Sequence, residues 1–186
     1  MQDFPIYLIP GRGDAIDDNP GGIIRRMGYP FQRREITPAF ESLRFPDQLK
    51  VIKTELASGF WRHDALLIGR SYGAYLLLHS LSEMQDFPGR LLLFSPVLGP
   101  ARNRNGFYGS IPPRSGKLLR LAENNLFPLF QYLEIHTGTD DNGCNPLLAE
   151  RFVAPFKNAR LCLVQGAGHH LDDAYVSDVL MNFLKV

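Results

Sequence analysis

The chain has 186 residues, of which 45% are hydrophobic and 21% are charged, a composition typical of a folded globular protein. Lysine and arginine number 20 and aspartate and glutamate 19, so the net charge of +1 gives no electrostatic reason to expect a nucleic acid or an anionic membrane as partner. The length predicts a single domain over residues 1–186, and no apolar run approaches the roughly 18 residues that a membrane span requires.

Short apolar runs recur along the chain at intervals that leave room for helices. The predicted strands are Ile6–Pro10, Phe31–Ile36, Ala65–Gly69, Leu91–Ser95, Leu133–Thr137 and Leu161–Gln165. Most of these runs are hydrophobic throughout, as expected for parallel strands that are covered on both faces. The second run is polar at positions 32–35, which indicates a strand at the edge of the sheet.

Helical patterns lie between the predicted strands. They cover Asp47–Phe60, Gly73–Met84, Pro146–Lys157 and a last helix that Asp172 can cap. This alternation predicts an α/β fold: a three-layer α/β/α sandwich around a mostly parallel sheet of about six strands.

The segment from Gly99 to about Pro128 breaks this rhythm, since it is rich in glycine, proline, arginine and asparagine. A connection this long is usually functional unless it is disordered. We expect a lid or binding segment over 99–128, with a helix near Lys117–Asn125, and we expect Phe107 and Tyr108 to contact the substrate.

The strand that starts near Ile6 leaves no room for a signal peptide, which predicts a soluble cytoplasmic protein. The only two cysteines, Cys144 and Cys162, are far apart and lack the spacing of metal ligands. A disulfide framework is therefore not expected, and a reducing compartment fits best. Cys162 stands in an apolar run and is expected to be a buried core thiol.

The strongest local motif is Gly-Arg-Ser-Tyr-Gly at positions 69–73, between a predicted strand and a predicted helix. This is the G-x-S-x-G pattern in the strand–turn–helix context of a nucleophile elbow. The glycines are needed because larger side chains would collide with neighbouring backbone. Ser71 would then stand at the carboxyl edge of the sheet, next to the positive end of a helix dipole.

A serine nucleophile needs a base, and the chain offers five histidines: His63, His79, His136, His169 and His170. His169 follows Gly-Ala-Gly just after the last strand, so it lies at the same edge as Ser71. His79 in a helix and His136 in a strand are expected to be structural, and His63 should lie at the opposite edge. His170 is the remaining alternative to His169 as the base.

The base in turn needs an acid, and Asp140 and Asp141 both follow the fifth strand at the carboxyl edge. The pattern alone leaves the two aspartates open. The chain order Ser, Asp, His is the order that α/β-hydrolases use.

The first loop, Pro-Gly-Arg-Gly at positions 10–13, could supply part of an oxyanion hole. The two N–H donors would come from Arg12 and from Tyr72, the residue after the nucleophile. The loop lacks the G-x-x-x-x-G-K-[ST] pattern of a phosphate loop. If the first and third predicted strands are neighbours and the second lies outside them, the loop borders the crevice in which open α/β sheets bind ligands.

Taken together, these motifs resemble the α/β-hydrolase superfamily over nearly the whole chain, and are similar to the small retinoblastoma-binding type of serine hydrolase and its bacterial relatives. The resemblance implies a minimal sheet without the first two strands of the usual eight. It also favours Asp141 over Asp140 as the acid and agrees with His169 as the base. Arg70 departs from the pattern, because histidine or an apolar residue is commoner there; it either reaches a carboxylate in the substrate or pairs with a nearby acid.

The expected function is hydrolysis of a carboxylic ester or thioester, a small-molecule acyl substrate, through an acyl-enzyme on Ser71, with no metal or organic cofactor. The alternatives are amide or peptide hydrolysis by the same residues, a non-catalytic module that binds a ligand or protein, and acyl transfer to an acceptor other than water.

Overall fold

The computed structural model describes residues 5–15, 17–101 and 111–185, and these contain one six-stranded sheet. The strands run in the order β2-β1-β3-β4-β5-β6, and every neighbouring pair is parallel. The strands are β1 (Ile6–Ile9), β2 (Gln32–Arg33), β3 (Leu66–Arg70), β4 (Phe87–Phe94), β5 (Phe130–Gly138) and β6 (Ala159–Val164).

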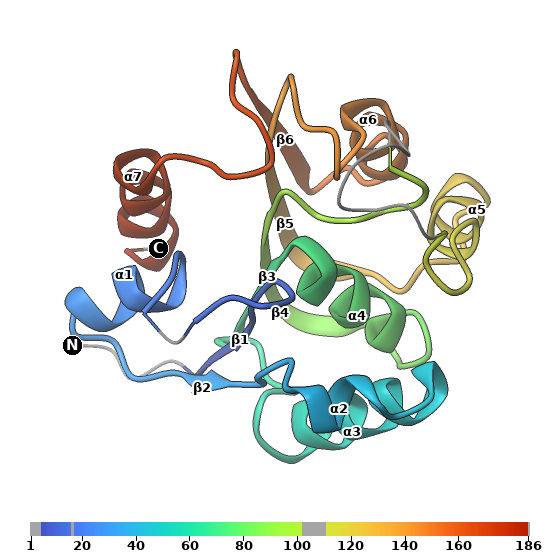
Figure 1. Ribbon diagram of the computed structural model, residues 1–186. Helices are drawn as coiled ribbons and strands as arrows, with labels where there is room; N and C mark the ends of the chain where they lie inside the picture. Colours follow the sequence, from blue (N-terminus) through green and yellow to red (C-terminus); the bar gives the residue numbers. More distant parts are fainter. Residues whose placement is uncertain (1–4, 16, 102–110, 186) are drawn as a thin grey trace.

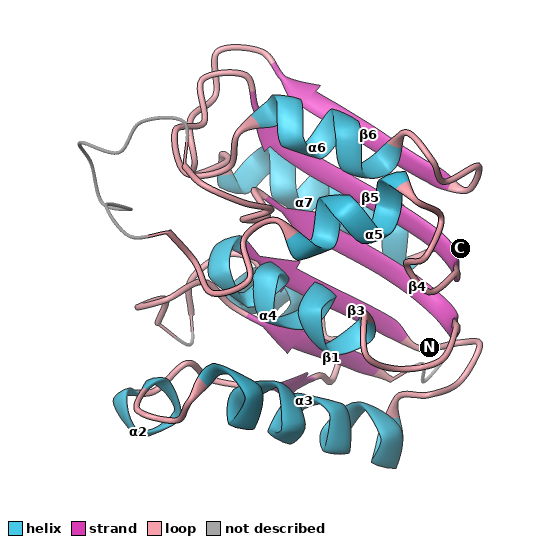
Figure 2. Ribbon diagram, turned by 90° about the vertical axis from the view of Figure 1, so that its right-hand side faces the viewer, coloured by secondary structure: helices cyan, strands magenta, loops and turns pink. Residues whose placement is uncertain are grey.

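Helices cover both faces of this sheet, which Figure 1 presents nearly edge-on. On one face lie α1 (Gly21–Arg26) and α7 (Asp173–Leu184). The other face carries α2 (Pro38–Glu41), α3 (Phe45–Gly59), α4 (Ser71–Leu81), α5 (Lys117–Glu123) and α6 (Pro146–Val153), and Figure 2 shows it from that side. Among the described residues, no helix combines the length and the apolar character that crossing a membrane would require.

The two faces of the sheet bury separate apolar clusters because side chains alternate along each strand. Leu67 and Leu93 pack toward α3–α6, whereas Leu66, Ile68 and Leu92 pack toward α1 and α7. All five of these side chains are fully buried. The near-continuous hydrophobic runs of the sequence therefore reflect coverage on both sides, as in other parallel sheets.

All six predicted strands are present, and the predicted α/β/α architecture is confirmed. The second strand is indeed at an edge, but it is only two residues long. β4 begins at Phe87, four residues before the predicted start, and its pairing with β5 is irregular between Phe87 and Arg90. The sequence pattern did not predict α1 and α2, since four to six residues are too few to establish a helical period.

The turn from β3 into α4 packs closely against the end of β1, and this contact requires glycine at position 73. A Cβ built on Gly73 would lie 2.1 Å from the carbonyl oxygen of Pro10 and 2.4 Å from that of Ile9. Both neighbours are backbone atoms of a central strand and its exit, so they cannot move aside. The amino end of α4 is thereby held against the first loop.

Gly73→Ala is expected to reduce the free energy of unfolding by about 1–3 kcal/mol, the usual effect of forcing extra atoms into a packed site. Urea denaturation would measure the change. Gly59→Ala, at the end of α3, is the matched control, because a Cβ there has no neighbour within 4 Å. Equal stability of the two variants would contradict this account of the turn.

Candidate active site

Ser71 occupies the sharp turn between β3 and α4. It is the first residue of α4 and has a backbone φ of +50°, a conformation that non-glycine residues rarely adopt. The turn is possible because Gly69 has no side chain: a Cβ there would lie 2.7 Å from the Cα of Ala74. Strained backbone of this kind is concentrated at functional sites.

A continuous chain of hydrogen bonds links Ser71, His169 and Asp141. The Nε2 atom of His169 lies 2.8 Å from the Oγ atom of Ser71. On the other side of the ring, Nδ1 lies 2.9 Å from Oδ1 and 3.1 Å from Oδ2 of Asp141. The carboxylate fixes the proton on Nδ1, which leaves Nε2 able to accept the proton of the serine hydroxyl.

The carboxylate of Asp141 is fully buried and accepts several further hydrogen bonds. The backbone N–H groups of Gly143 and Cys144 both donate to Oδ1 at 2.8 Å, and the hydroxyl of Thr137 donates to Oδ2 at 3.2 Å. A buried carboxylate needs such donors because an unpaired buried charge is strongly unfavourable. The sequence motif did not reveal Thr137 or these amides as partners.

Asp140, the neighbour of Asp141 in the sequence, has a different environment in the structure. The side chain of Asp140 is exposed and accepts a hydrogen bond from Thr139, while its N–H donates to the carbonyl of Ala167 at 3.0 Å. The loop after β6, which carries His169, therefore packs on the loop after β5. Gly138 permits this approach, since a Cβ there would lie 1.9 Å from the Ala167 oxygen.

Three of the other histidines, His63, His79 and His136, lie away from Ser71. His79 is fully buried between the rings of Phe45 and Tyr75, and burial lowers the pKa of its imidazole to about 3, so it is neutral. His136 bonds to Glu134 and Tyr175 on the α7 side of the sheet. His63 lies before β3, at the amino edge of the sheet as expected.

Arg70, the residue before the serine, is engaged by residues of the protein itself. Its Nη1 atom lies 2.5 Å from Oδ2 of Asp14, and the two side chains are only 9% and 11% exposed. The same Asp14 oxygen accepts the N–H of Gly11 at 2.6 Å. Arg70 thus has the acid partner that was one of its two expected roles; a contact with substrate stays a prediction. Asp14 was missed because no local pattern marks it.

The two residues predicted to form an oxyanion hole lie beside each other. The guanidinium of Arg12 stands 4.4 Å from the ring centre of Tyr72, and it also forms an ion pair with Glu41. Tyr72 is the second residue of α4, so its N–H belongs to the first helical turn, which has no intrahelical carbonyl to bond. The side-chain stacking holds the first loop next to that turn.

Two pockets meet at Ser71. One has a volume of about 220 Å³ and a mostly apolar lining that includes Val97, Ala101 and Ile111. The other has a volume of about 510 Å³, and the ionisable side chains of Asp14, Arg70, His169 and His170 are among its lining residues.

The expected lid segment contributes to the first pocket only in part. Pro113 lies in its wall, and the carbonyl of this residue accepts a hydrogen bond of 2.5 Å from the hydroxyl of Tyr75 on α4. The predicted helix near Lys117–Asn125 is present as α5. Phe107 and Tyr108, the expected substrate contacts, lie outside the described residues, and the lid role stays a prediction.

Comparison with solved structures identifies the architecture. Esterase PE8 aligns with a TM-score of 0.67 and 17% identity over 98% of this chain and 92% of its own. A Xanthomonas campestris protein described as a hydrolase of the alpha/beta superfamily aligns with a TM-score of 0.67 and 16% identity over 98% of both chains. This chain has the α/β-hydrolase fold.

A third α/β-hydrolase-fold structure, a monoacylglycerol lipase from Paleococcus ferrophilus, aligns with a TM-score of 0.66 and 13% identity over 97% of this chain and 92% of its own. No family model matches the sequence, and no curated protein matches it either. The likeness at these identities extends to the fold. The resemblance to the retinoblastoma-binding type has no support from sequence comparison and stays a prediction.

The contact between Arg70 and His170 can be tested by titration. Nη2 of Arg70 lies 2.5 Å from Nδ1 of His170, so Nδ1 accepts a hydrogen bond from the guanidinium and the imidazole is neutral. Burial and then the positive charge of Arg70 lower the pKa of His170. In Arg70→Gln the pKa of His170 is expected to rise, as measured by an NMR pH titration of the ring Cε1–H and assigned with His170→Gln. An unchanged or lower pKa would contradict the contact.

Proposed function

We propose that this protein is a serine hydrolase that cleaves a carboxylic ester or thioester with a short acyl group, through an acyl-enzyme on Ser71. The observation that carries the proposal is the 2.8 Å contact between Ser71 Oγ and His169 Nε2, with the opposite ring nitrogen bonded to buried Asp141. A hydroxyl next to an oriented imidazole is the arrangement that activates a serine nucleophile.

In the first half-reaction, Ser71 Oγ attacks the acyl carbon and its proton passes to His169 Nε2. The carbonyl oxygen becomes an oxyanion, and the N–H groups of Arg12 and Tyr72 are the proposed donors that stabilise it. The tetrahedral intermediate then collapses. The bond to the alcohol or thiol breaks, and the leaving group takes the proton from His169.

In the second half-reaction, water enters beside His169. Nε2 accepts one proton of this water while its oxygen attacks the acyl carbon of the ester on Ser71. The bond to Ser71 breaks, and the serine oxygen recovers the proton from His169. The acid product leaves, and the free hydroxyl of Ser71 is restored. Asp141 stays ionised and stabilises the imidazolium in both half-reactions.

The two pockets at Ser71 support a division of the substrate. The apolar pocket of about 220 Å³ suits an acyl chain, and it is smaller than the roughly 300–1,000 Å³ of sites that hold drug-sized ligands. The pocket of about 510 Å³ beside His169 and His170 lies on the side from which the leaving group would be protonated. The esterase and lipase names of two structural neighbours support ester chemistry over amide chemistry.

Ser71→Ala is expected to abolish labelling by a fluorophosphonate probe and to lower ester turnover by about three orders of magnitude or more, because the nucleophile is lost. Gel fluorescence and hydrolysis of an activated acetyl ester would measure the two effects. Ser82→Ala, at the opposite end of the same helix, is the matched control and should retain both.

Absence of labelling in a folded wild-type protein would contradict the proposal and favour a non-catalytic ligand-binding module. Labelling of Ser71→Ala to the same extent as wild type would also contradict it, since another nucleophile would then react.

The size of the apolar pocket predicts a preference for short acyl chains. In a series of p-nitrophenyl esters, kcat/KM should fall as the chain lengthens beyond what this pocket holds. Ala101→Phe, which places a ring in the wall of the pocket, should make this fall steeper while acetyl ester turnover is kept. A preference that rises with chain length in both proteins would contradict the assignment of this pocket to the acyl group.

A further inference from the structure

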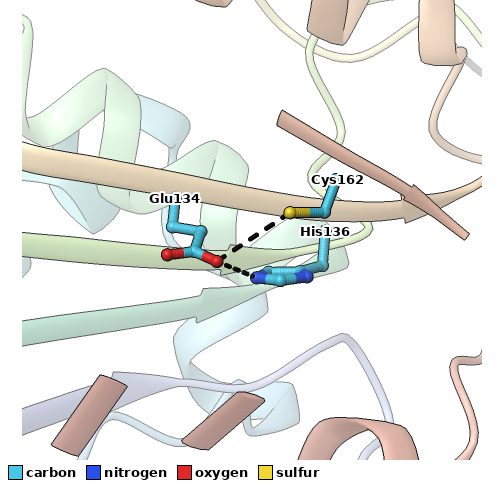
Figure 3. A group of neighbouring side chains, drawn as sticks. All are labelled: Glu134, His136 and Cys162. Carbon is cyan, nitrogen blue, oxygen red and sulfur yellow. Dashed lines mark hydrogen bonds and ion pairs between the residues drawn. The ribbon is translucent and has the colours of Figure 1, made fainter. Parts of the chain in front are cut away.

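A second group of reactive side chains lies on the opposite face of the sheet from α3–α6. In the parallel register of β5 and β6, His136 is paired with Cys162. Glu134 stands two residues before His136 on β5 and so points to the same face. Figure 3 shows the three side chains converging, and they line a groove beside Tyr175 of α7.

The potential ligand atoms of these residues are close enough to share one ion. Glu134 Oε1 lies 2.9 Å from His136 Nε2 and 3.9 Å from Cys162 Sγ, and all three atoms lie within 4.8 Å of one another. In a tetrahedral zinc site with bonds of about 2.0–2.3 Å, neighbouring ligand atoms are roughly 3.3–3.8 Å apart. The two Glu134 separations lie just below and just above this range, and the separation of His136 and Cys162 is at most 4.8 Å, so side-chain shifts of no more than about 1 Å would form the site.

Two tyrosines orient the ligand atoms. The hydroxyl of Tyr175 lies 2.8 Å from Nδ1 of His136, which leaves Nε2 turned toward the other two residues. The hydroxyl of Tyr132 donates to Oε2 of Glu134 at 3.2 Å, which leaves Oε1 turned toward the same point. Metal-binding histidines and carboxylates in proteins have outer partners of this kind, which fix the orientation of the ligand.

The arrangement does not suit a cysteine nucleophile. Both ring nitrogens of His136 are already engaged, by Glu134 and by Tyr175, so His136 is not placed to take a proton from Cys162. Burial raises the pKa of the Cys162 thiol, which keeps it protonated in the absence of a cation. A bound metal ion would displace that proton, because thiolate is the form that binds.

The expectation that Cys162 is a core thiol is corrected here. Cys162 is half-buried at the edge of the sheet and lines the groove, whereas Cys144 is the fully buried cysteine. The groove has a volume of about 660 Å³ and is also lined by Arg90, Asp178 and Asn182. Among the residues that the structure describes, it shares no lining residue with either pocket at Ser71.

One cation already lies near the cluster. Nη1 of Arg160 is 3.7 Å from Glu134 Oε1, but the Arg160 side chain is 65% exposed. The Arg160 side chain can therefore turn into solvent when a metal ion binds that oxygen.

We propose that Glu134, His136 and Cys162 bind a divalent cation of the zinc class, with a fourth coordination position open to the groove. The mixed carboxylate, imidazole and thiolate set is one that Zn²⁺ accepts in proteins and that hard cations such as Mg²⁺ do not favour.

The test uses tag-free protein of residues 1–186, stripped of metal with a chelator and then titrated with ZnCl₂ against a chromophoric competitor. One zinc ion per chain is expected. CoCl₂ in place of zinc should produce the near-ultraviolet charge-transfer band of a cobalt–thiolate bond. This band should be lost in Cys162→Ala and kept in Cys144→Ala, where Cys162 is the only cysteine left in the chain.

Two further variants distinguish the site from adventitious binding. His136→Gln should abolish stoichiometric zinc binding, and Tyr175→Phe, which leaves all three ligands in place, should weaken it by about 10- to 100-fold. Circular dichroism would establish that each variant is folded. No zinc binding by wild type, or equal affinity of wild type and Cys162→Ala, would overturn the proposal. If Cys162→Ala fails to fold, unchanged affinity in Tyr175→Phe would overturn it instead.

Discussion

The contact between the amino end of α4 and the exit of β1 is the constraint on which the site depends. Ser71 adopts a positive φ only because Gly69 and Gly73 allow the helix to start immediately after β3 and to press on the carbonyls of Ile9 and Pro10. This contact places the first loop beside the serine and directs the free amides of the helix toward it. A larger side chain at either glycine would push the amino end of α4 away from the exit of β1 and the first loop.

Buried charges add a second constraint on the same crevice. Arg70 and Asp14 are both nearly inaccessible to water, so each requires the other, and Asp14 also holds the amide of Gly11. The residue next to the serine is thus tied to the loop that carries Arg12. Asp141 is restrained in the same way, because its carboxylate accepts hydrogen bonds from two backbone amides and a hydroxyl. Its remaining hydrogen-bond-accepting capacity is directed at His169. Both arrangements hold the polar groups in place before any ligand binds.

The strand β5 contributes residues to two chemically different sites. Its carboxyl end leads to Asp141, while Glu134 and His136 face the groove beside α7 and the alternate residues Leu133 and Ile135 face the core under α3–α6. The alternation of side chains along a strand makes this possible. A polar pair in the middle of a covered strand is unusual, because burial of such groups is unfavourable unless they are partnered. Here Tyr132 and Tyr175 supply the partners within the groove.

The sequence by itself determined the strands, the order of the motifs and the placement of Ser71 and His169 at one edge, because hydrophobic periodicity and a strand–turn–helix motif are local signals. It left open which of Asp140 and Asp141 is the acid that partners the histidine, because both residues lie in the same loop. Only the contacts of this loop with Ala167 and His169 distinguish their roles. It did not reveal Asp14 as the partner of Arg70, nor Cys162 as the neighbour of His136. Those pairs join residues far apart in the chain, and their meeting is decided by the strand order and by the register of β5 and β6, which form only when the sheet assembles.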